Sequence, residues 1–93
     1  MTTRKELIEE QYTLLKEEIE NNFGNNLQHL LPPLQEINIT DILYYFVYIF
    51  DITNIKFSIK VMLNFKSIQL DDTDIDKLCE ILLPFVQFIK TLE

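Results

Sequence analysis

The chain has 93 residues, of which 47% are hydrophobic and 12% aromatic, and its formal charge at pH 7 is −7. A chain of this length is expected to form one domain, residues 1–93, with a core of its own. The negative charge disfavours binding to nucleic acid and to anionic membrane surfaces. The longest uninterrupted apolar run, Ile42–Phe50, has nine residues, about half of what a bilayer-spanning helix needs.

The cysteine content and the N-terminus indicate the compartment. Cys79 is the only cysteine and has no partner for an internal disulfide, so we expect a reducing, cytoplasmic or otherwise intracellular location. Residues 1–6 lead directly into an acidic segment and do not resemble a signal peptide.

The N-terminal quarter of the chain predicts an amphipathic helix. Thr2 or Thr3 would cap its start and Gly24, the only glycine, would end it. Apolar residues recur every three or four positions, as on one buried helix face: Ile8, Tyr12, Leu15, Ile19 and Phe23.

The opposite face of this helix is acidic. Its candidate partner-binding residues are Glu9, Glu10, Glu17 and Glu20. A charged helix face is usually just solvated; the functional alternative is a docking surface for a protein partner with a basic site.

Residues 27–34 predict a covering segment and no long element. Its leucines stop at Pro32-Pro33, and the residue before a proline is pushed out of the helical region. His29, the only histidine, has no Cys or His nearby in the sequence, which favours a surface role over metal binding or catalysis.

The run Ile42–Phe50 carries five of the eleven aromatic residues and must be largely covered. Its Tyr, Phe, Val and Ile content favours a strand, with Asp51–Asn54 as a hairpin loop. The alternative is a buried helix over 41–52 with Thr40 as its cap, because short apolar runs fit both periods.

Residues Ile55–Phe65 alternate apolar and polar side chains, a period of two that predicts a half-buried strand. Residues 67–70 then predict a short third strand after a tight reversal. The expected fold is therefore α+β, with two amphipathic helices flanking an antiparallel meander of two or three strands (42–50, 55–65 and 67–70). The alternative is an all-α bundle with 41–52 as its central helix.

The C-terminal segment predicts a second amphipathic helix. Asp72 or Thr73 would cap it, and Pro84 would kink or divide it because proline removes a helical hydrogen bond. Cys79 lies on its apolar stripe with Ile75 and Leu82, so we expect a buried, unreactive thiol.

The sequence argues against most chemistries. Asp72, Asp74 and Asp76 have the first spacing of a calcium loop, but Lys77 and Leu83 stand where glycine and glutamate are required. One glycine excludes a phosphate-binding loop, and one histidine and one cysteine far apart give no catalytic pair. A nucleic-acid-binding surface on this region would contain only three basic residues, Lys56, Lys60 and Lys66. We therefore expect no enzyme activity, cofactor or metal.

The leading functional hypothesis is a small acidic protein-binding or assembly module, acting as a complex subunit or as an inhibitor. In the strand arrangement one face of the aromatic run lacks a cover and would form a homodimer or another protein interface. That face consists of Ile42, Tyr44, Phe46, Tyr48 and Phe50. One alternative is an all-helical immunity-type or adaptor bundle; another is a small enzyme or ligand-binding domain using Tyr44, Tyr48 and Asp51.

Overall fold

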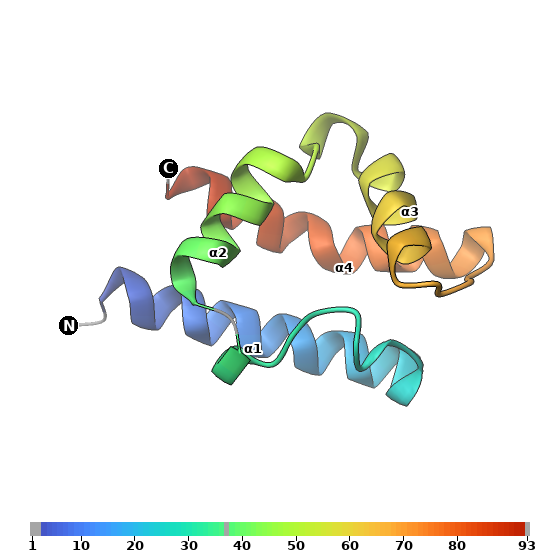
Figure 1. Ribbon diagram of the computed structural model, residues 1–93, viewed down its shortest axis with the longest axis horizontal. Coiled ribbons are helices and arrows are strands. Elements are labelled where there is room, and N and C mark those ends of the chain that lie inside the picture. Colours follow the sequence, from blue (N-terminus) through green and yellow to red (C-terminus); the bar gives the residue numbers. More distant parts are fainter. Residues whose placement is uncertain (1–2, 37, 93) are drawn as a thin grey trace.

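The computed structural model describes residues 3–36 and 38–92, and every regular element in these residues is helical. The predicted α+β fold with a strand meander is therefore wrong, and the all-α alternative agrees with the structure. Helices α1 (Arg4–Phe23) and α4 (Asp72–Thr91) run antiparallel (Figure 1). Helix α3 (Ile55–Phe65) packs against α4, whereas α2 (Ile39–Tyr44) contacts α1.

Helix α1 begins and ends where the sequence predicts. The backbone N–H of Glu6 donates to Thr3 Oγ1 at 3.1 Å, and Gly24 follows the last turn with a φ of 60°, a conformation that glycine adopts without steric cost. The chain then passes through the 3₁₀ turns η1 (Gly24–Leu27) and η2 (Leu34–Glu36) as it returns along α1. Figure 1 shows this covering segment running beside α1.

The predicted strand Ile55–Phe65 is helix α3, and the reason lies in its spacing. Every odd-numbered position is apolar, and these positions form two series with a spacing of four. Ile59 and Leu63 of one series are buried, whereas Phe57, Val61 and Phe65 of the other are exposed. Two stripes on opposite helix faces therefore produce the same alternation as a strand.

The predicted third strand, 67–70, is wrong because these residues close α3. Ser67 has a φ of 58°, and the backbone N–H of Ile68 donates to the carbonyl of Leu63 at 2.9 Å. This bond is the six-to-one contact of a Schellman helix end.

The predicted strand over 42–50 is also wrong. Its first part belongs to α2, which is capped by Asn38 and not by Thr40: the backbone N–H of Asp41 donates to Asn38 Oδ1 at 2.9 Å. The rest is η3 (Tyr45–Ile49), a π-helical turn in which Phe50 N–H donates to the Tyr45 carbonyl at 2.9 Å. The 3₁₀ turn η4 (Ile52–Asn54) replaces the predicted hairpin loop.

Helix α4 differs from prediction at its cap and at its proline. Asp71 is the cap, with its Oδ1 accepting from the N–H of Asp74 at 2.8 Å. The helix continues through Pro84 as one element. Pro84 is exposed, so water can solvate the carbonyl of Glu80 that proline leaves without a donor.

The core lies between α1 and α4 and extends under α2, η3 and α3. The rings of Phe46 and Phe85 meet edge to face with centroids 5.0 Å apart, and Tyr12 lies 6.1 Å from Phe85. Fully buried side chains come from all of these elements: Ile8, Tyr12, Ile42, Phe46, Ile59, Leu78, Leu82 and Ile89.

Candidate partner-binding groove

The outer face of α3 carries an exposed apolar stripe. Phe57, Val61 and Phe65 lie four residues apart, and Phe65 is 83% exposed. On the opposite face of the same helix, Ile59, Met62 and Leu63 are buried. Helix α3 is thus apolar on both sides, which a helix on the surface of a small domain does not need for folding.

A second apolar surface faces this stripe from α2 and η3. Tyr44 and Tyr48 have ring centroids 5.7 Å apart and are both exposed, as is Ile49. The π-helical turn lies within this wall, and such turns occur frequently at functional sites.

The two walls enclose a groove of about 520 Å³. Tyr44, Tyr45 and Ile49 line it from one side, and Val61 and Phe65 from the other. Its floor consists of residues from α1, the covering segment and the core: Tyr12, Leu30, Leu31, Pro32, Phe46 and Met62. We call this region the α2–α3 groove. A smaller pocket of about 150 Å³, lined in part by Phe57 and Ser58, extends it toward η4.

The floor of the groove is fixed to α1 by side-chain hydrogen bonds. The Tyr12 hydroxyl donates to the Pro32 carbonyl, and Lys16 Nζ donates to the carbonyls of Leu31 at 2.9 Å and Pro32 at 3.3 Å. Burial raises the pKa of Tyr12 above its ordinary value and lowers that of Lys16. These hydrogen bonds fix the covering segment, and with it the floor of the groove, to α1.

The charges at the groove are unevenly distributed. Asp41 lines the α2 side and Lys66 the α3 side. Lys56 is paired with Asp76 at 3.0 Å, and its hydrogen bond to that carboxylate raises its pKa. Within residues 3–36 and 38–92, neither Lys60 nor Lys66 forms an ion pair, and both are exposed.

The structure divides the aromatic residues predicted to bind a partner. Tyr44 lines the groove and Tyr48 stacks on Tyr44 beside it, but Phe46, on the groove floor, and Phe50 are only 2% exposed. The predicted common face followed from a strand, in which alternate residues point the same way; in the helical arrangement these four side chains diverge. The sequence reasoning missed Phe57, Val61 and Phe65, whose four-residue spacing was the available signal.

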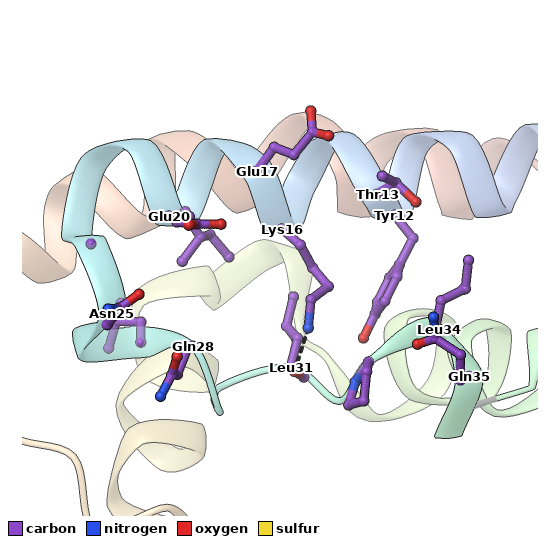
Figure 2. Close-up of a pocket in the computed structure, with 14 residues that line it drawn as sticks. Tyr12, Thr13, Lys16, Glu17, Glu20, Asn25, Gln28, Leu31, Leu34 and Gln35 are labelled. Atoms are coloured by element: carbon purple, nitrogen blue, oxygen red, sulfur yellow. Dashed lines mark hydrogen bonds between the residues drawn. The ribbon is translucent and has the colours of Figure 1, made fainter.

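The acidic residues predicted on α1 do not share one site. Glu17 and Glu20 border a cavity of about 290 Å³ between α1 and the covering segment. Figure 2 shows Lys16 reaching across this cavity to Leu31, whereas Glu17 points away from it. Glu9 lies 3.9 Å from Lys5 toward the start of the helix, and Glu10 is exposed to solvent.

The side chains considered for chemistry are spread over the molecule. Asp51 caps η4, and hydrogen bonds from Thr53 lower the pKa of its carboxyl. His29 is exposed and lies 3.3 Å from the Gln28 amide nitrogen. Cys79 was predicted to be buried, but it is only half-buried. Desolvation raises the pKa of its thiol. Within the described part of the chain, no three His, Cys, Asp or Glu side chains are arranged to hold a metal ion.

Comparisons with protein families, with curated proteins and with solved structures gave no match. Among the described helices, none combines the length and apolar content needed to cross a membrane.

Proposed function

We propose that the chain is a non-enzymatic helical adaptor that binds a partner protein in the α2–α3 groove. The observation that carries the proposal is the exposed apolar surface on both walls. Four aromatic side chains in or beside the groove are far from buried: Tyr44 at 58%, Tyr48, which stacks on Tyr44, at 68%, Phe57 in the smaller pocket at 59% and Phe65 at 83% exposed. At ~200 Å² per aromatic side chain, they present roughly 500 Å².

An exposed area of this size has an energetic consequence. The largest apolar patch on an ordinary monomer is itself about 300–600 Å² and is often functional, and one side of a standard protein interface buries about 800 Å². With Val61 and Ile49 added, the groove and the aromatic side chains beside it provide most of that area. Its aromatic content and its preformed floor are typical of interface centres.

The absence of enzyme activity is part of this proposal. His29 lies on the covering segment and Cys79 on α4. The thiol therefore has no histidine base near it in the sequence or on its own helix. Asp51 already serves as a helix cap. Tyr44 and Tyr48 then have a role as contact residues, for which tyrosine suits because its ring is apolar and its hydroxyl can stay in water.

An adaptor contacts more than one protein, and the acidic face of α1 is the second predicted surface. Glu10, Glu17 and Glu20 are exposed and remain candidates for a partner with a basic site. An intracellular setting, suggested by the free thiol of Cys79, belongs to the same proposal.

Site-specific photo-crosslinking tests the groove directly. A benzophenone amino acid in place of Phe65 should cross-link one partner protein in cells that make this chain. The control places the same group at His29, which is exposed outside the groove. The partner, once purified, should bind the wild-type chain and lose at least tenfold in affinity for Val61→Asp. The same products from both positions, or unchanged affinity for Val61→Asp, would contradict the proposal.

A second copy of the chain is the competing occupant. Of the four aromatic residues predicted for the homodimer, Phe46 and Phe50 are almost fully buried, whereas Tyr44 and Tyr48 are exposed. Light scattering at micromolar concentration measures this, and Tyr48→Glu should split any dimer that uses the groove. A monomer mass would leave a different protein as the partner.

A further inference from the structure

We infer that the partner segment is an amphipathic α-helix of about three turns whose apolar stripe is flanked by acidic residues. The inference rests on the proposed function and names the class of partner. Three properties of the α2–α3 groove support it: its length, the spacing of its contacts and the charges beside it.

The length of the groove fits a short helix. Helix α3 has 11 residues and is about 16 Å long at 1.5 Å per residue. The opposite wall, α2 followed by η3, also has 11 residues, from Ile39 to Ile49. A helix lying between two helical walls of this length meets them over about three turns, and such helices bind through anchors at i, i+4 and i+7.

The spacing of the exposed side chains supports helix packing. Phe57, Val61 and Phe65 recur at every fourth residue, which forms one ridge along α3. Ridges of this kind pack into the grooves of another helix. Backbone pairing with a strand has no support, because the described residues contain no sheet edge.

The charge beside the ridge is opposite to that of the rest of the molecule. Residues 55–70 contain three lysines and no carboxylate, although the whole chain has a charge of −7. Lys56 is occupied by Asp76, which leaves Lys60 and Lys66 available beside the apolar stripe. Acidic residues on the partner would complement them, and opposite charges across an interface increase association rate and specificity.

A second copy complements this surface poorly. In a twofold dimer the same patch meets itself, so four lysines, Lys60 and Lys66 of each copy, would share one interface with two Asp41 carboxylates. Asp41 is the carboxylate on the walls of the 520 Å³ groove and lies on the side away from α3. Asp51, in the smaller pocket, already accepts hydrogen bonds from Thr53. A different chain with acidic flanks avoids this repulsion.

Three synthetic peptides test the inference. Each is an alanine-based helix of about 18 residues with leucine at i, i+4, i+7 and i+11, and the flanking positions carry Glu, Gln or Lys. Fluorescence anisotropy should show that the wild-type chain binds the Glu peptide about fivefold more tightly than the Lys peptide. If the net charge of −7 alone governed binding, the Lys peptide would bind more tightly than the Glu peptide. The order of the two affinities therefore distinguishes local lysine contacts from the overall charge.

Two pairs of variants locate the effect. Lys60→Glu with Lys66→Glu should reverse the preference, whereas Lys5→Glu with Lys77→Glu, an equal charge change elsewhere, should leave it intact. Val61→Asp should abolish binding of the Glu peptide. Circular dichroism should show the same helix content for all variants, because the substituted side chains are exposed.

The outcomes also separate this inference from the proposed function. Equal or tighter binding of the Lys peptide, or no binding of any peptide, overturns the acidic helix as partner class. If the Phe65 cross-link still identifies a protein, the groove remains the binding surface. A dimer of the chain that Val61→Asp splits would likewise overturn the inference. Loss of both the cross-link and peptide binding would overturn both.

Discussion

Truncation of two neighbouring residues, Val61 and Met62, tests the helical arrangement of α3. A strand would bury Val61 and expose Met62, because its alternate residues point to opposite faces. In the structure Val61 is 52% exposed and Met62 is 6% exposed. The two arrangements therefore predict opposite orders of stability for Val61→Ala and Met62→Ala. Ile59 would not distinguish them, since both arrangements bury it.

The magnitudes follow from burial. Met62→Ala removes a core side chain and should cost about 3 kcal/mol, within the 2–5 kcal/mol measured for such truncations. Val61→Ala removes two half-exposed methyl groups, a loss of about 0.8 kcal/mol. The higher helix propensity of alanine returns about 0.5 kcal/mol, so the net change should be close to zero.

Urea unfolding followed by circular dichroism at 222 nm measures both variants. The unfolding midpoint of Met62→Ala should fall while the slope stays constant, which indicates a change in stability alone. A larger loss for Val61→Ala than for Met62→Ala would refute the helical arrangement of this segment and, with it, the α2–α3 groove.

Three further predictions concern groups outside α3. Burial raises the pKa of Tyr12, so above pH 10 the folded state keeps the phenol proton while the unfolded state loses it. The free energy of unfolding should therefore fall as the pH rises, by up to about 1.4 kcal/mol per pH unit. The fall should be less steep in Tyr12→Phe. Asp71→Ala should cost about 1 kcal/mol in urea unfolding through loss of the α4 cap, whereas Asp71→Ser should be nearly neutral. Cys79 should react with a thiol reagent at pH 7 more slowly than it does in urea, because desolvation raises its pKa; equal rates would contradict its partial burial.

The sequence predicted the two long helices because each has one apolar stripe and a polar opposite face. Ile8, Tyr12 and Leu15 on α1 fit only a helical period, and Gly24 has a clear role after the last turn. Asp71 was missed as the α4 cap because Asp72 and Thr73 are equally suitable residues. Pro84 was expected to interrupt the helix, but its exposed position lets water take the place of the lost hydrogen bond.

Helix α3 could not be predicted from its pattern, because the pattern has two explanations. Apolar residues at every odd position fit a strand. They also fit a helix with two apolar faces, of which one is buried in the core and the other is exposed. A rule that expects only one apolar face selects the strand. The wrong strand prediction and the candidate site thus have the same cause: Phe57, Val61 and Phe65 are apolar although they are exposed.

The aromatic run shows the corresponding limit for the groove. The sequence pattern predicts Tyr44, Phe46, Tyr48 and Phe50 as contact residues; Tyr44 lines the groove with Tyr48 stacked on it, but Phe46 and Phe50 are buried in the core. Which aromatic residues face outward depends on the backbone rotation per residue, and a π-helical turn changes that rotation within the run. No periodic pattern in the sequence marks such a turn.

The π-helical turn also decides where the chain tolerates a change of length. A π turn holds one residue more than the α turn that would replace it. Deletion of Val47 would make the bond from the Phe50 N–H to the Tyr45 carbonyl an ordinary i→i−4 bond, so the ladder would close as an α-helix and Phe50 would stay in the core. A deletion of Leu43, within α2, has no extra residue to absorb it and would rotate the residues on one side of it by about 100° around the helix axis. Loss of Val47 should therefore lower the free energy of unfolding less than loss of Leu43.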